Sequence, residues 1–294
     1  MPIKTEMLKS IFKTLKVNHY IKNLVVFIPL IFSHNFINLI FCYKCLLMFI
    51  SFCLISSSVY ILNDLIDIEE DEKHPVKSRR PIASGKITKP FAVLMFFILL
   101  MLSSLSAYNI NVFCLISIYS YLVLNIFYSL WLKKIILIDS ACIALGFIIR
   151  IIAGCCVIKV MPSALVILMT FFISNFFTGI KRRLEIQLRD YSSNLRTSMS
   201  KIDINTINQF ILINAILSIS FYITYVLDEQ TILKTGSQYL YFTVIPFTLI
   251  VYRLLLLVNT SKIDDDPIIY LEKDKLIKIL FLLYFIVYAI VVIF

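Results

Sequence analysis

Long apolar stretches dominate this chain, and they constrain its fold more than any other feature. Hydrophobic residues make up 60% of its 294 positions and charged residues only 16%, against about 25% charged in an ordinary soluble domain. Because a helix needs about 20 apolar residues to cross a bilayer, we predict an all-α, polytopic membrane protein with nine transmembrane helices. A soluble enzyme, a nucleic-acid-binding domain and a disordered chain are excluded as classes. The predicted spans are residues 23–41, 45–63, 91–108, 110–130, 135–158, 163–180, 207–227, 238–258 and 276–294.

Charged residues are confined almost entirely to alternate connections between these spans. If the N-terminus is cytoplasmic, the cytoplasmic segments hold 24 of the 28 Lys and Arg residues and 15 of the 18 Asp and Glu residues. Lys and Arg are enriched on the cytoplasmic side of membrane proteins, so we expect a multi-pass protein of the cytoplasmic membrane with its N-terminus inside. That rule does not require acids there, so the mixture indicates a polar site on the cytoplasmic face. The counted segments are residues 1–22, 64–89, 131–134, 181–206 and 253–278.

The first 22 residues are basic and carry no pattern typical of a cleaved signal peptide. Residues 5–17 place apolar side chains opposite lysines at helical spacing, which predicts an amphipathic helix on the membrane surface. The longest polar connections hold about 25 residues, too few for a core of their own. We therefore predict one integral membrane domain over residues 1–294, whose first 22 residues form the amphipathic segment. The seven cysteines are interpreted as apolar packing residues and not as zinc ligands.

Three aspartates with helical spacing follow the second predicted span. Asp64, Asp67 and Asp71 are separated by three and four residues, so a helix places them on one face. Their charges repel one another unless a cation lies between them, and oxygen ligands beside a phosphate are typical of Mg²⁺. The plain alternative is a solvated acidic helix end, which is less favourable where the motif begins in an apolar span. We predict that these aspartates are catalytic and bind Mg²⁺ together with a diphosphate.

Basic residues follow the aspartates within a single connection. Lys77, Arg79 and Arg80 precede Pro81, and the proline ring restricts the backbone of the loop. Arginine presents a planar fork to phosphate oxygens, whereas lysine presents a point charge. Carboxylates on one side and cations on the other predict a site for a metal-bound diphosphate.

Several segments together form a set that can be compared with a known family. They are Asn63–Asp71, Arg80–Gly85, His19–Asn23 with Pro29 and Leu30, Tyr128–Lys133, Asp139 with Gly146, Phe147 and Arg150, and Lys181–Glu185. The first two resemble the UbiA superfamily of intramembrane prenyltransferases, and the resemblance covers about residues 13–294. It implies a nine-helix bundle with a Mg²⁺-diphosphate bound at its cytoplasmic side. The other segments are similar to the decaprenyl-phosphate phosphoribosyltransferase branch. That branch joins 5-phosphoribosyl 1-diphosphate to a polyprenyl phosphate and releases diphosphate.

The resemblance also implies roles for residues outside the acidic motif. Typical prenyltransferases carry a second Asp-rich motif after the sixth span, where this chain has cations that favour a donor with an additional phosphate. The lipid phosphate is expected near Lys22 and Lys133, with its tail in a lateral opening between spans. Lys133 is equally typical of a membrane-interface anchor, and Arg150 of a structural partner for carbonyls or amides of nearby spans. The candidate substrate-binding residues are Lys22, Asn63, Lys77, Arg79, Arg80, Tyr128, Lys133, Asp139, Arg150, Lys181, Arg182, Arg183, Glu185 and Arg253.

The predicted function is therefore phosphoribosyl transfer in the synthesis of cell-envelope polysaccharide precursors. Two other functions are alternatives to it. The first is a UbiA-type prenyltransferase that moves a prenyl group from a polyprenyl diphosphate to an aromatic or other small acceptor. The second is a lipid transporter, which is disfavoured because the charges gather at one face and no internal repeat is evident. The polyprenyl chain length and the oligomeric state stay open at this level.

Overall fold

A computed structural model of the chain describes residues 2–135, 138–187, 203–259 and 274–293, and every regular element within these ranges is helical. Nine helical stretches among the described residues are long and apolar enough to cross a membrane. The prediction of an all-α protein with nine spans is therefore confirmed. The nine stretches are Glu6–Phe32, Leu39–Ile66, Lys89–Tyr108, Val112–Leu130, Ile138–Ile158, Ala164–Ile186, Ile204–Leu227, Gln238–Val258 and Lys275–Val292.

The chain groups into two compact units. Unit 1 comprises Met1–Ile135 and Gly146–Pro162, and unit 2 comprises Ile136–Leu145 and Ser163–Phe294. Helix α7 (Ile138–Ile158) contributes residues to both. The prediction of one domain over the whole chain stays a prediction.

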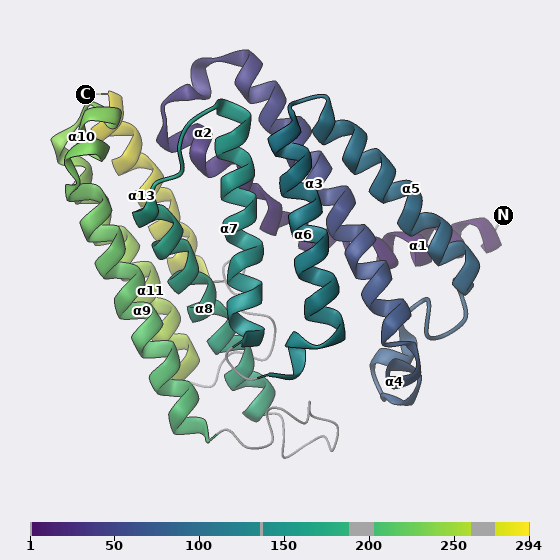
Figure 1. The fold of residues 1–294 in the computed structure, drawn as a ribbon. Helices are drawn as coiled ribbons and strands as arrows, with labels where there is room; N and C mark the ends of the chain where they lie inside the picture. The colour runs from purple at the N-terminus through teal and green to yellow at the C-terminus, as the bar shows by residue number, and fades with distance from the viewer. Residues whose placement is uncertain (1, 136–137, 188–202, 260–273, 294) are drawn as a thin grey trace. The chain divides into compact units, whose positions relative to one another are not determined.

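Unit 1 is built around the long helix α3 (Leu39–Ile66), which packs against α5 (Lys89–Tyr108) and α6 (Val112–Leu130). Figure 1 shows these three helices side by side. Asn38 starts α3, because its side-chain oxygen accepts hydrogen bonds from the backbone N–H groups of the first turn. Fully buried apolar side chains of α3 and α6 form the centre of the unit, among them Cys45, Met48, Phe52, Ile55 and Ile118.

The N-terminal part of unit 1 differs from the predicted span at residues 23–41. The structure divides it into α1 (Pro2–Leu15), the 3₁₀ helix η1 (Val17–Phe27), α2 (Ile28–Phe32) and the short η2 (Asn35–Ile37). Lys16 adopts the left-handed conformation with φ 52°, and His34 does so with φ 58°, so the helix is interrupted at both residues. The predicted range was wrong because its last residues already belong to α3.

Unit 2 contains two pairs of packed helices with a short connection between them. Helix α8 packs against α9, and α11 packs against α13. The first pair comes close at Gly179, where a Cβ atom would lie 2.8 Å from the side chain of Ile211. The elements are α8 (Ala164–Gln187), α9 (Ile204–Leu227), α10 (Glu229–Thr235), η7 (Gln238–Thr243), α11 (Val244–Asn259) and α13 (Lys275–Ile293).

Candidate active site

The acidic motif lies where α3 ends and α4 (Ile68–Lys73) begins. The backbone N–H of Asp67 donates to the carbonyl of Asn63 at 3.0 Å, and that of Asp71 donates to the carbonyl of Asp67 at 2.8 Å. These bonds continue the helical spacing through the junction, so Asp64 and Asp71 come to the same side. Below them, Ile61 and the neighbouring apolar residues of α4, α5 and the connecting loop form a small core that holds the motif in place.

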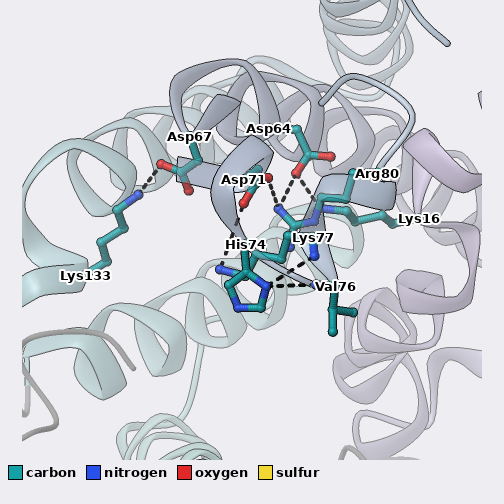
Figure 2. A network of polar contacts seen from close by, with 9 residues as sticks. All are labelled: Lys16, Asp64, Asp67, Asp71, His74, Val76, Lys77, Arg80 and Lys133. Carbon is teal, nitrogen blue, oxygen red and sulfur yellow. Dashed lines mark hydrogen bonds and ion pairs between the residues drawn. The ribbon is translucent and has the colours of Figure 1, made fainter. Parts of the chain in front are cut away.

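Asp64 and Asp71 meet at one guanidinium group. Nη1 of Arg80 lies 3.1 Å from Oδ1 of Asp64 and 2.6 Å from Oδ2 of Asp71. Both carboxylate side chains are 2% exposed, whereas that of Arg80 is 29% exposed. The ammonium group of Lys16 approaches Asp64 to 2.9 Å, and that of Lys77 lies 4.0 Å from Asp71. Figure 2 shows the two carboxylates on either side of Arg80. We call Lys16, Asp64, Asp71, Lys77 and Arg80 the acidic cluster.

Asp67 takes a different partner. Its Oδ1 lies 2.5 Å from Nζ of Lys133, in η4 (Leu132–Lys134) after α6. Figure 2 shows this pair apart from Arg80. Within the described ranges no group of three His, Cys, Asp or Glu side chains is arranged to hold a metal ion. The structure thus brings together two of the three predicted ligands, with the third about one helical turn away.

The pair Asp64 and Asp71 has the chemistry of a divalent-cation site. Two carboxylate oxygens lie within 3.1 Å of a single nitrogen, so they are close enough for one cation to contact both. Hard oxygen ligands are those that Mg²⁺ prefers, and Mg²⁺ commonly takes only one or two carboxylates, with phosphate oxygens and water filling its other positions. The residues present therefore fit Mg²⁺ with Asp64 and Asp71 as ligands.

His74 orders the loop between the acids and the cations. Its Nδ1 accepts hydrogen bonds from the backbone N–H groups of Val76 at 3.2 Å and Lys77 at 3.3 Å. Burial, followed by the positive charge of Lys77, lowers the pKa of His74 below its ordinary value. The imidazole is therefore neutral near neutral pH, which matches the acceptor role of Nδ1.

Arg150 belongs to a second polar group in the interior of unit 1. Nε of Arg150 donates to Oδ1 of Asn23 at 2.8 Å, and Nη1 donates to the carbonyl of Gly146 at 2.7 Å. Nη2 lies 3.1 Å from the hydroxyl of Tyr121 and 3.5 Å from that of Ser56. Aromatic rings cover the guanidinium group, including that of Tyr121 at 4.5 Å. These contacts support the structural interpretation of Arg150, and they define what we call the Arg150 cluster.

The remaining candidates of unit 1 lie around the acidic cluster or near helix ends. Arg79 is exposed, and its carbonyl accepts a long hydrogen bond of 3.5 Å from Lys13. Lys22 in η1 and Tyr128 near the end of α6 are half-buried. Asn63 contributes its carbonyl to the helical junction described above. Their predicted roles in substrate binding stay predictions.

Unit 2 holds the other predicted cations and two acids. The guanidinium group of Arg182 bridges Asp139 and Glu185, with both N–O distances at 2.6 Å. Arg183 is buried and donates to the backbone carbonyl of Val258, whereas Lys181 is exposed. Binding of a phosphate by Arg182 would therefore compete with two carboxylates.

Arg253 also lies in unit 2, at an ion pair with Asp274. Its Nη2 is 2.9 Å from the carboxylate of Asp274. Burial alone would raise the pKa of Asp274, but hydrogen bonds from Arg253 and from the backbone N–H of Ile277 hold that pKa below its ordinary value. The pair joins α11 to the start of α13, and substrate binding by Arg253 stays a prediction.

Comparison with known proteins agrees with this arrangement of helices. The sequence profile of the UbiA prenyltransferase family matches residues 27–291. The chain belongs to this family. It is therefore a multi-pass membrane protein and a transferase of the UbiA type.

Two relatives with assigned names and one solved structure are similar to this UbiA protein. It is 27% identical to decaprenyl-phosphate phosphoribosyltransferase of Mycolicibacterium smegmatis over 80% of this chain and 76% of that protein. The enzyme of the same name from Corynebacterium glutamicum is 32% identical over 48% and 43% of the two chains. A UbiA homologue from Archaeoglobus fulgidus, solved with GPP and Mg²⁺, superposes with a TM-score of 0.67 at 16% identity. That comparison covers 97% of this chain and all of the other.

Lys16 is the residue of this UbiA site that the sequence did not indicate. It lies 48 residues before its partner Asp64, within a basic segment assigned to the membrane surface. Its ammonium group also lies 4.8 Å above the ring of Tyr60. No spacing rule relates Lys16 to the acidic motif, because their contact depends on how the chain bends at Lys16 between α1 and η1.

Proposed function

We propose that this UbiA protein transfers 5-phosphoribosyl from 5-phosphoribosyl 1-diphosphate to a polyprenyl phosphate and releases diphosphate. The observation that carries the proposal is the pair of buried carboxylates, Asp64 and Asp71, with Arg80 between them and Lys16 and Lys77 beside them. Carboxylates that fit a divalent cation, next to cations that fit phosphate oxygens, suit a diphosphate leaving group. A product of this kind would serve as a precursor of cell-envelope polysaccharide.

The choice of donor is supported by two further observations. Relatives at 27% and 32% identity are named decaprenyl-phosphate phosphoribosyltransferases. The last turns of α8 carry Lys181, Arg182 and Arg183, which suit a donor that carries a phosphate in addition to its diphosphate. A prenyl diphosphate has no such group.

The proposed reaction is a single displacement at the anomeric carbon of the donor. The bond from that carbon to the diphosphate oxygen breaks, and its electron pair leaves with the diphosphate. An oxygen of the lipid phosphate forms the new bond from the opposite face, which inverts the configuration. That oxygen is already anionic near neutral pH, so the reaction requires no strong general base, and neutral His74 need not act as one.

The residues of the acidic cluster would divide the work on the leaving group. Mg²⁺, when bound, supplies positive charge that stabilises the developing diphosphate. Asp64 and Asp71 would hold the ion. Arg80 and Lys77 would contact oxygens of the diphosphate. Arg80 is well suited to this exchange because its side chain is partly exposed while those of its two partners are buried.

The excess of Lys and Arg in alternate connections supports a cytoplasmic N-terminus and a cytoplasmic active site. A single cysteine placed at exposed Glu70, in a cysteine-free variant of the full chain, tests this orientation. In sealed right-side-out vesicles of the cytoplasmic membrane, a membrane-impermeant maleimide should label it only after permeabilisation. Labelling of intact vesicles would place the site on the opposite side.

The decisive experiment is product analysis with the purified full chain in lipid nanodiscs. Labelled 5-phosphoribosyl 1-diphosphate, decaprenyl phosphate and MgCl₂ should yield a phosphoribosylated lipid and free diphosphate, both detected by mass spectrometry. A parallel reaction with decaprenyl diphosphate and 4-hydroxybenzoate tests the prenyltransferase alternative. Prenylated benzoate without phosphoribosylated lipid would overturn the proposal.

A further inference from the structure

A cleft opens beside the acidic cluster, between the end of α1, the start of η1 and the loop that carries Arg80. Its volume is about 290 Å³. Only Asp64 and Arg80 among its lining residues belong to the predicted diphosphate site. The lining residues are Lys13, Lys16, Val17, Asn18, His19, Asp64, Arg80 and Pro81.

The charge of this lining suits an anion. Three basic side chains, those of Lys13, Lys16 and Arg80, line the cleft together with the single carboxylate of Asp64. His19 adds an imidazole that packs against Tyr60, with ring centroids 5.5 Å apart. Lysine is a common point-charge ligand of phosphate groups, and a phosphate monoester carries close to two negative charges near pH 7.

The backbone at Lys16 is bent in a way that builds this cleft. Lys16 has φ 52° and ψ 47°, a left-handed conformation that is uncommon for a residue with a Cβ atom and that surrounding contacts must maintain. The hydroxyl of Ser57 donates to the carbonyl of Leu15 at 2.8 Å and also lies 2.7 Å from the hydroxyl of Tyr20. These two contacts hold the chain on either side of Lys16, so that α1 and η1 both face the cleft.

The apolar surface next to the cleft suits a lipid tail. On α1, Leu8 and Phe12 are exposed and lie one turn apart on one side of the helix. On η1, exposed apolar side chains continue from the cleft along the helix, at Val17, Ile21 and Leu24. An amphipathic helix with lysines beside exposed apolar residues lies at the level of lipid headgroups, which is where the phosphate of a membrane lipid is found.

We infer that this cleft binds the phosphate monoester of the lipid acceptor through Lys16 and Lys13, with the first isoprene units against Val17 and Ile21. The inference rests on the proposed function, and it names the acceptor site that the sequence had assigned to Lys22 and Lys133. Lys133 instead pairs with Asp67. In this arrangement the acceptor phosphate lies on the α1 and η1 side of Asp64 and Arg80, with the anomeric carbon of the donor between it and the diphosphate.

Equilibrium binding of radiolabelled decaprenyl phosphate to the full chain in nanodiscs tests this site without turnover. Lys16→Gln should weaken binding about tenfold, because a hydrogen bond to a charged group is worth about 1.5 kcal/mol or more. Lys13→Gln should weaken it about threefold, since its side chain is exposed. Lys16→Arg should retain most of the affinity. Lys9→Gln, one turn earlier on α1 and outside the cleft, is the matched control and should leave binding unchanged.

Competition experiments distinguish the phosphate of the lipid acceptor from the phosphates of the donor, 5-phosphoribosyl 1-diphosphate. Unlabelled decaprenyl phosphate should displace the label from the wild type, whereas decaprenol and inorganic phosphate should compete poorly. If Lys16→Gln and Lys13→Gln weaken binding of 5-phosphoribosyl 1-diphosphate more than that of the lipid, the cleft holds the donor and the inference is overturned. If decaprenol competes as well as decaprenyl phosphate, the cleft does not recognise a phosphate. Lysine-dependent lipid binding without any phosphoribosylated product would refute the proposed function and leave this site standing.

Discussion

Unit 1 contains two groups of polar residues that handle charge in opposite ways. In the acidic cluster, the carboxylates of Asp64 and Asp71 are buried, and their cationic partners are partly exposed. In the Arg150 cluster, the cation itself is buried and only 6% exposed, and the identified hydrogen-bond partners of its guanidinium group are amide, carbonyl and hydroxyl groups. The first group can exchange partners with an anionic substrate that enters from outside. In the described part of the chain, no ion pair gives Arg150 a partner of opposite charge to exchange.

Under the proposed function, this difference predicts that the acidic cluster serves the reaction and that the Arg150 cluster serves the fold. Arg150 holds η1 through Asn23, and the same helix α7 approaches η1 again at Gly154. A 3₁₀ helix of 11 residues is unusually long, since runs beyond three or four residues are uncommon. Contacts from α7 therefore stabilise the segment whose first residues build the cleft.

The largest expected effect is on activity, from replacing a shared carboxylate. Asp64→Asn should lower turnover at least 1,000-fold, about 4 kcal/mol in transition-state stabilisation, because charge on the leaving group would go uncompensated. The fold should persist, since Asn has the same shape and Arg80 keeps Asp71. Steady-state assays and thermal unfolding in detergent measure the two quantities. Glu69→Gln, an exposed acid on α4, is the matched control and should keep near wild-type turnover. Loss of turnover in both variants would mean that general negative charge matters, and not this pair.

The next effect should fall on stability. Arg150→Gln would leave the polar partners of the guanidinium group in an apolar interior, and we expect a loss of about 3 kcal/mol in unfolding free energy. Activity per folded molecule should stay within about threefold of the wild type, because no part of the acidic cluster is removed. Denaturant titration in detergent, together with assays of the folded fraction, tests this. Unchanged stability with abolished turnover would return Arg150 to the substrate-binding set that the sequence suggested.

These two clusters also show how much of the fold and of the site could be predicted from the sequence. Apolar runs and charge alternation predicted the spans from α3 onward, because lipid burial acts on each helix separately. The i, i+7 spacing predicted that Asp64 and Asp71 meet, and the nearby loop supplied Arg80. The break at Lys16 and its contact with Asp64 were not predictable, because they depend on α7 and α3 holding η1 from distant positions in the chain. The ion pair between Asp67 and Lys133 was likewise not predictable, because it requires α6 to end beside α4.

A smaller effect tests whether η1 is held by close approach to α7. A Cβ atom at Gly154 would lie 2.3 Å from the carbonyl oxygen of Val26 and 3.0 Å from Pro29. Gly154→Ala should therefore lower the unfolding free energy by about 2 kcal/mol, within the usual range for overpacking. It should also loosen the cleft, which lies at the opposite end of η1. Gly146→Ala is the matched control on the same helix, because its Cβ would lie at ordinary contact distances of 3.5 Å and more. It should be neutral or stabilise slightly through helix propensity. Equal destabilisation by both would show that α7 tolerates no side chain at all, and would remove the special role of η1.

The smallest effect concerns the ion pair of Lys133 and Asp67, which does not involve Arg80. A double-mutant cycle with Lys133→Gln and Asp67→Asn should give a coupling of about 1 kcal/mol in unfolding free energy, because the pair is partly exposed to solvent. Such a value would place Asp67 between the two clusters in behaviour, with a partner that is close but screened. A coupling above about 3 kcal/mol, typical of a buried pair, would group Asp67 with the interior. A coupling near zero would mean that Asp67 is uncommitted to Lys133 and free to join Asp64 and Asp71 when a cation binds, as the spacing of the three aspartates first suggested.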